Sequence, residues 1–231
     1  MENVLLHYME KRLGEEFPLR EGLCGPHPFV TISREFGCPS KKIAGILAEK
    51  LNHLPGHEKN PKWKEINKEI IQEAAQQLNL DPMHIRYLFQ SEQMGFLDDI
   101  LSSFYLNSKS TMRIKKAVHD VIRSFAMAGY VVIVGRAGAA ITRNCSNGLH
   151  IRLQAPLEWR VQQVTVSRGI TADEARKLAN EMDKKRKIMM ETFYGNKFDL
   201  HIFDLIYNCH TFSREEIAQS ILNMMENKKM I

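Results

Sequence analysis

Residues 28–51 read PFVTISREFGCPSKKIAGILAEKL, and the rest of the chain is best interpreted outward from them. The run from Phe29 to Ser33 is short, β-branched and apolar, which is typical of a buried strand. A polar turn from Arg34 to Ser40 follows, and apolar residues then recur at helical spacing. The stretch therefore predicts a strand, a loop and a helix in that order.

Lys41 and Lys42 stand where the first turn of this helix is expected. That turn leaves backbone N–H groups unpaired, and the helix macrodipole makes this end positive. Cations are unfavourable there unless an anion lies between them, and a phosphate group fits such a helix start. We therefore expect Lys41 and Lys42 to bind phosphate; two merely solvated lysines are the alternative.

The loop before the helix does not match the P-loop consensus G-x-x-x-x-G-K-[ST], because it lacks both glycines and the lysine at their places. ISREFG followed by a polar turn and a basic helix start nevertheless resembles the cytidylate kinase-like family, whose phosphate loop reads R-E-F-G-S-G-G-R. The chain keeps Ser33 to Gly37 and departs at Cys38 to Lys41, with Pro39 in place of a glycine. The departure removes glycines that permit close backbone approach to phosphate.

Two later stretches carry the same resemblance. The apolar run 131–134 predicts a central parallel strand, and it leads into VIVGRAG at 132–138. Because ligands bind at the carboxyl ends of such strands, Arg136 is expected in the same crevice as the first loop; a structural salt bridge is its alternative role. APLEWRV at 155–161 and MDKKR at 182–186 resemble the lid of the family.

The resemblance implies a site built from separate parts of the chain. Arg160, Lys185 and Arg186 would close over the phosphates of a donor nucleotide, although a solvated helix face would also explain their charge. The expected catalytic residues are Lys41, Arg136, Arg160 and Arg186. The expected nucleotide-binding residues are Ser33, Arg34, Gly37, Cys38, Ser40, Lys41, Lys42 and Lys185. ATP and Mg²⁺ are the implied cofactors, with no residue assigned as a metal ligand.

The 231 residues suffice for one α/β domain. Residues 1–27 are expected to form an amphipathic helix and a linker, which leaves a homodimer open. Residues 28–231 are expected to form a P-loop kinase-like domain: a three-layer α/β/α parallel sheet with a helical cap in 53–128 and a lid in 155–197. The further elements expected are helices starting near 66 and at 81–106, 110–128, 172–178, 182–194 and 217–225, and strands at 149–153 and 203–208.

Composition and charge limit the partners and the location that are expected for the protein. A net charge of +5 is compatible with a polyanionic partner, but no basic block is long enough for a nucleic-acid arm. No apolar run approaches the roughly 20 residues of a membrane span, and the start of the chain lacks the pattern of a signal peptide. The four cysteines show no C-x-x-C pair or zinc-ligand spacing, so a reduced, cytoplasmic location is expected.

The leading hypothesis is a kinase that moves the γ-phosphate of ATP to a nucleoside monophosphate or a similar small acceptor. Such a reaction needs positive charge, in-line geometry and exclusion of water. A nucleotide-binding protein that has lost catalysis is the competing hypothesis, because Pro39, Asn67 and Ala137 each replace a residue used by cytidylate kinases or their relatives. A nucleic-acid-binding domain is not favoured, since aromatic stacking motifs and a recognisable reading helix are missing.

Overall fold

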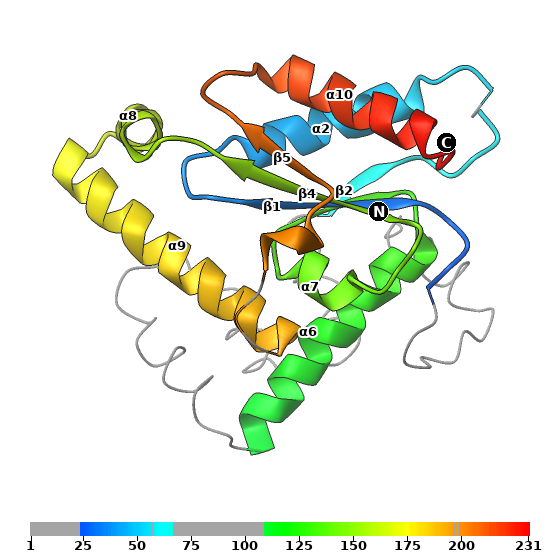
Figure 1. Cartoon of the computed structure of the whole chain (residues 1–231), viewed down its shortest axis with the longest axis horizontal. Coiled ribbons are helices and arrows are strands. Elements are labelled where there is room, and N and C mark those ends of the chain that lie inside the picture. Colours follow the sequence, from blue (N-terminus) through cyan, green and yellow to red (C-terminus); the bar gives the residue numbers. More distant parts are fainter. Residues whose placement is uncertain (1–23, 57, 67–108, 196, 198) are drawn as a thin grey trace, which may run out of the picture.

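A computed structural model describes residues 24–231 apart from residues 57, 67–108, 196 and 198. Its centre is a five-stranded sheet in the order β2-β3-β1-β4-β5, and every neighbouring pair of strands is parallel (Figure 1). The strands are β1 (Phe29–Arg34), β2 (Lys64–Ile66), β3 (Val131–Val134), β4 (Gly148–Gln154) and β5 (Leu205–Asn208).

Helices cover both faces of the sheet, which confirms the expected three-layer α/β/α arrangement (Figure 1). One face carries α2 (Ser40–Asn52) and α10 (Arg214–Asn227), and the other carries α6 (Lys109–Ala128), α7 (Gly138–Thr142) and the C-terminal part of α9 (Ala172–Tyr194). The helix α8 (Leu157–Arg168) lies beyond the carboxyl edge of the sheet, and a 3-10 turn, η1 (Leu200–Ile202), precedes β5.

Each face of the sheet has its own apolar core, which explains why the central strands are apolar throughout. Alternate residues of β1 point to opposite faces, so Val30 and Ile32 pack with α2 and α10 while Phe29 packs with α6 and α7. The four residues of β3 are likewise buried, and they divide between the same two cores. Burial on both faces is the reason for continuous apolar runs in central parallel strands.

Most of the expected elements are confirmed, and two expectations are wrong. Residues 64–66, expected to lead directly into a helix, form β2 instead, paired in parallel with β3 through Lys64 and Ile66. The separate helices expected at 172–178 and 182–194 are one helix, α9, because no Gly or Pro interrupts the residues between them. The pattern S-x-x-E at 213–216 predicts a capping box, and Ser213 and Glu216 form one at the start of α10. The expected N-terminal helix and the helices expected between residues 67 and 106 lie outside the described residues.

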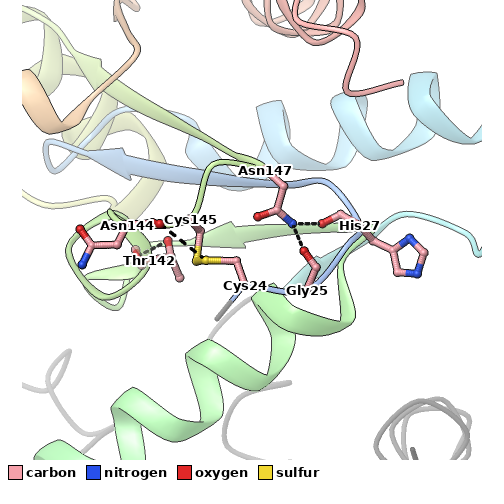
Figure 2. Close-up of a disulfide and its surroundings, with 8 residues drawn as sticks. Cys24, Gly25, His27, Thr142, Asn144, Cys145 and Asn147 are labelled. Carbon is pink, nitrogen blue, oxygen red and sulfur yellow. Dashed lines mark hydrogen bonds between the residues drawn. A yellow bond between two sulfur atoms is a disulfide. The ribbon is translucent and has the colours of Figure 1, made fainter. Parts of the chain in front are cut away.

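A disulfide joins Cys24 to Cys145, with a Cα–Cα distance of 5.3 Å and a sequence separation of 121 (Figure 2). It ties the segment that enters β1 to the loop between α7 and β4, where the amide of Asn147 also donates hydrogen bonds to the carbonyls of Gly25 and His27. The cysteine spacing, from which a reduced location was expected, did not reveal this pair. Disulfide connectivity depends on the fold and cannot be deduced from spacing alone.

Within the described part of the chain, no helix combines the length and the apolarity that crossing a bilayer requires.

Candidate functional site

The loop between β1 and α2, residues 35–39, lies at the carboxyl edge of the sheet. Gly37 has a φ of +94°, and a Cβ there would lie only 2.9 Å from Cβ of Arg160, so this position requires glycine. Ser40 begins α2 and is buried, whereas Lys41 and Lys42 in the same turn are exposed. The first turn of α2 contains no acidic residue, so no side chain of that turn neutralises the positive helix end or the two lysines.

A cavity of about 700 Å³ opens beside this loop. Three parts of the chain that are distant in sequence form its walls: the loop and the start of α2, the helices of the lid, and the segment after β5. Its lining residues are Arg34, residues 36–42, Trp159, Gln163, Ser167, Arg186 and residues 209–215. The cavity lies at the carboxyl ends of β1 and β5, where open α/β sheets bind their ligands.

The cavity gathers most, but not all, of the cations expected from the sequence. Arg34, Lys41, Lys42 and Arg186 line it. The Arg186 guanidinium lies 5.3 Å above the ring of Phe36, and its Nη1 lies 3.4 Å from the carbonyl oxygen of Arg34. Arg186, contributed by the lid, therefore contacts the loop directly.

Other expected residues lie elsewhere. Arg136 follows β3 in the left-handed region, with a φ of +53°, and neither it nor Lys185 is among the residues that line the cavity. Ser33 is buried within β1 and does not line the cavity either. A Cβ on Gly135 would meet the Arg34 guanidinium at 1.9 Å, so the end of β3 leaves room for Arg34 and lies close to the loop.

Arg160 is buried behind the loop and does not line the cavity. Its Nη1 donates to the carbonyl of Phe36 at 3.0 Å and to Oδ2 of Asp183 at 2.7 Å, and its Nε donates to the carbonyl of Ala155 at 2.9 Å. The other carboxylate oxygen of Asp183 accepts from the N–H of Phe36 at 2.7 Å. The pair of Arg160 and Asp183 thus satisfies both backbone groups of Phe36 and joins the loop to α8 and α9.

Glu35 forms a second connection between the loop and the lid. Its Oε2 accepts from the N–H of Ala155 at 3.1 Å and lies 3.4 Å from Nε of Arg160, while its Oε1 lies 3.8 Å from Arg152. Sequence reasoning did not assign roles to Glu35 or Asp183. Their positions within ISREFG and MDKKR, the two motifs quoted for the resemblance, are the signal that could have identified them.

Aromatic side chains also line the cavity. Trp159 and His210 have ring centroids 6.1 Å apart, and Phe212, about half exposed, lines the same space. Such rings can stack with a planar base. Sequence reasoning did not assign the segment 209–215 to the site, although its place directly after a strand of a parallel sheet is a signal for one.

Two free cysteines, Cys38 and Cys209, line the cavity and are nearly buried. The two thiols lie close enough to affect each other's ionisation. The neighbouring Cys209 and burial raise the pKa of Cys38 far above its usual range, whereas Cys38 lowers the pKa of Cys209.

A resident metal centre does not fit this site. Across the described ranges, no cluster of three or more His, Cys, Asp or Glu side chains could hold an ion. Magnesium that arrives with a nucleotide needs few protein ligands, because the phosphates and water supply most of its coordination. The hydroxyl of Ser40, buried at the helix start beside the cavity, fits that limited role.

The parallel sheet and its two layers of helices define an α/β protein, and the cavity lies at the carboxyl edge where such sheets bind their ligands. The chain belongs to the cytidylate kinase-like family, whose profile matches residues 29–211.

Individual relatives support this assignment at low identity. The chain is 23% identical over 203 residues to a cytidylate kinase of Sulfolobus acidocaldarius, covering 87% of this chain and 96% of that protein. It is 30% identical over 103 residues to a cytidylate kinase of Methanopyrus kandleri, covering 41% of this chain and 53% of that protein. An uncharacterized protein from Eubacterium ventriosum has a similar fold, with a TM-score of 0.61 at 19% identity, over 87% of this chain and 99% of that one.

Proposed function

We propose that the protein is a nucleotide kinase that transfers the γ-phosphate of ATP to a nucleoside monophosphate or a similar small acceptor. The observation that carries this proposal is the convergence of Arg34, Lys41, Lys42 and Arg186 on one cavity at the carboxyl edge of the sheet. Phosphoryl transfer requires little covalent chemistry from the protein, because catalysis depends on positioning and on stabilising negative charge. Membership of the cytidylate kinase-like family supports the same reaction class.

Each wall of the cavity has a role in donor binding. The triphosphate would lie over residues 37–42, where the helix dipole and the two lysines neutralise its charge. The base would lie between the aromatic side chains of Trp159, His210 and Phe212. Arg186 would reach the transferring phosphoryl group from α9 with a bidentate guanidinium, which suits phosphate oxygens better than an ammonium does.

Magnesium, when bound with ATP, would neutralise charge on the phosphates, and Ser40 would be its contact on the protein. Arg160 would act as a positioning residue in this scheme, because it fixes the loop through Phe36 and Asp183. Arg136 and Lys185 remain proposed phosphate contacts, with Arg136 assigned to the acceptor side at the end of β3. The acceptor is proposed to be a small nucleotide because two relatives are named cytidylate kinases.

A cytoplasmic location is proposed on the ground that both substrates of such a reaction are intracellular metabolites. The disulfide of Cys24 and Cys145 is the opposing observation, since disulfides are rare in cytosolic proteins outside hyperthermophiles. Alkylation of the protein in intact cells, followed by peptide mapping of this cysteine pair, tests the location. The homodimer and the lack of a nucleic-acid partner also stay predictions, which size-exclusion chromatography and a nucleic-acid binding assay check.

The loop itself favours a second candidate, a nucleotide-binding protein without turnover. Pro39 has no N–H to offer, and the N–H groups of Cys38 and Ser40 already donate to the carbonyls of Glu35 and Cys38 at 3.3 and 2.9 Å. Few loop amides are therefore left for a phosphate. Ala137, which stands where cytidylate kinases have a carboxylate, also favours this second candidate.

A coupled assay of ADP formation with ATP, magnesium and a panel of nucleoside monophosphates tests the proposed kinase. Turnover above the background without acceptor is the expected result. Calorimetry with ATP and magnesium separates the two candidates, because binding without turnover supports the second one. A folded protein that binds no nucleotide in calorimetry contradicts both.

A further inference from the structure

The two free cysteines come from segments that meet beyond the end of β4. Cys38 belongs to the loop after β1, and Cys209 directly follows β5, with β4 between these strands in the sheet. The N–H of Glu35 donates to Leu153 at 3.0 Å, and the N–H of Cys209 donates to Gln154 at 2.8 Å. Both segments are thus held against the last residues of β4, and this allows the two side chains to meet.

The two cysteines are buried together and are still accessible from the cavity. Cys38 and Cys209 belong to the same apolar core cluster and are less than a tenth exposed. Both line the proposed nucleotide cavity, which gives a small solute a path to them. Cys38 lowers the pKa of Cys209, and the thiolate is the reactive form of cysteine.

We propose that Cys38 and Cys209 form a reversible disulfide in response to a peroxide, and that this bond closes the nucleotide cavity. The sulfur of Cys209 attacks one oxygen of hydrogen peroxide, the O–O bond breaks, and the second oxygen leaves as water after taking a proton. The sulfur of Cys38 then attacks the Cys209 sulfenic acid, the S–O bond breaks, and a second water leaves with the proton of Cys38. Two thiols lose two electrons and two protons in total, and one peroxide becomes two waters.

The bond would act directly on the phosphate loop. The sulfurs of a disulfide lie about 2.05 Å apart, so oxidation draws the loop toward the segment 209–215, which lines the same cavity. Cys38 lies between Gly37 and the start of α2, where the triphosphate is proposed to bind. A loop fixed in this way cannot open around the phosphates. Bound ATP, in turn, covers the path to both thiols and should slow their oxidation.

The existing disulfide does not interfere with this reaction, because Cys24 and Cys145 are already paired with each other at the opposite end of β1. Mapping of peptides without reduction distinguishes the two links by mass. The proposed bond itself does not depend on the kinase assignment; only its effect on nucleotide rests on the proposed function.

The test uses the full chain, exposed to graded hydrogen peroxide, then alkylated and mapped by mass spectrometry without reduction. The expected result is a peptide pair linked through Cys38 and Cys209 that disappears with dithiothreitol. In Cys38→Ser, dimedone should trap a sulfenic acid on Cys209, whereas Cys209→Ser should leave Cys38 largely unlabelled. Circular dichroism before and after oxidation ensures that a folded protein is measured. Separate alkylation of both cysteines in folded, peroxide-treated protein overturns the proposal.

Calorimetry with ATP and magnesium on the reduced and oxidised forms tests the closing of the cavity. We expect the oxidised form to bind at least tenfold more weakly, and saturating ATP to slow formation of the link. Equal affinities in the two forms overturn the closing even if the link is found. If the reduced protein does not bind ATP, both the proposed function and the proposed closing of the cavity are overturned. Peptide mapping still decides whether Cys38 and Cys209 form a disulfide.

Discussion

Replacing Arg160 with methionine separates a structural role from a phosphate-binding role for this residue. Methionine keeps much of the length of the side chain and removes its charge. The change leaves the carboxylate of Asp183 and the carbonyls of Phe36 and Ala155 without the donor that satisfies them. The 3.4 Å ion pair with Glu35 is lost as well.

The size of the effect follows from the burial of the network. Removing one partner of a buried ion pair costs about 3–5 kcal/mol, because the remaining charge is left uncompensated. The Arg160 side chain is 8% exposed, but Glu35 and Asp183 are 25% and 27% exposed and water can partly solvate them. We therefore expect the lower end of the range, about 3 kcal/mol. At about 2–4 °C per kcal/mol for a chain of this size, Tm falls by roughly 6–12 °C.

Urea and thermal unfolding of R160M, each with and without ATP and magnesium, provide the measurement. The structural role predicts the full loss of stability in the protein without nucleotide. A matched control is R176Q, since Arg176 pairs with Glu158 between the same two helices, α8 and α9, but in an exposed position. That variant should unfold close to the wild type, because exposed ion pairs contribute little.

The opposite outcome would refute the structural role of Arg160. If R160M without nucleotide is as stable as the wild type, and only the stabilisation by ATP disappears, then Arg160 contacts phosphate as the resemblance implied. R160K provides a second comparison. A lysine cannot make the divergent hydrogen bonds to Phe36, Asp183 and Ala155, so the structural role predicts that R160K also loses stability without nucleotide.

Four further outcomes are expected. Gly37→Ala adds a methyl at a φ of +94°, 2.9 Å from a side-chain carbon on α8, and urea titration should show a loss of about 1–3 kcal/mol; wild-type stability would mean that the loop can relax. Lys41→Met should weaken ATP binding at least tenfold in calorimetry while thermal unfolding without nucleotide stays unchanged, because the residue is exposed; unchanged affinity would exclude a phosphate contact. Burial lowers the pKa of His150, so the unfolded state binds the extra proton and stability should fall as pH drops below about 6.5, by at most about 1.4 kcal/mol per unit; His150→Asn should flatten this dependence. Replacing Cys24 and Cys145 together by serine should cost roughly 2–5 kcal/mol, since their disulfide closes a long loop, and unchanged urea midpoints would contradict that.

Local patterns were sufficient for the central part of the fold. The strand, loop and helix of residues 28–51 were predictable because β-branched burial, a turn and helical spacing are all short-range signals. The capping box at Ser213 was predictable for the same reason. β2 was not, because three residues carry too little pattern and Lys64–Ile66 is defined by its pairing with β3.

Only part of the candidate site could be predicted from the sequence. Lys41 and Lys42 were expected from their place at a helix start, and Arg34 and Arg186 from the resemblance to the family; all four line the cavity. Nothing local distinguishes these cations from Arg160, whose burial depends on Asp183, 23 residues further on in another helix. The pairing of free thiols and the disulfide are likewise contacts between distant segments, which spacing does not encode.

The loop lacks the family's glycines, and the network around Arg160 holds its backbone in place. A glycine-rich loop binds phosphate with backbone amides, which are fixed dipoles aligned before the reaction begins. Here Pro39 removes one amide, internal bonds occupy two others, and Arg160 with Asp183 holds the loop through Phe36. Binding would then depend more on the mobile, strongly hydrated ammonium groups of the two lysines, which attract a triphosphate but hold it less rigidly. A site of this kind should bind ATP with a marked dependence on salt and should accelerate transfer less than a glycine-rich loop does.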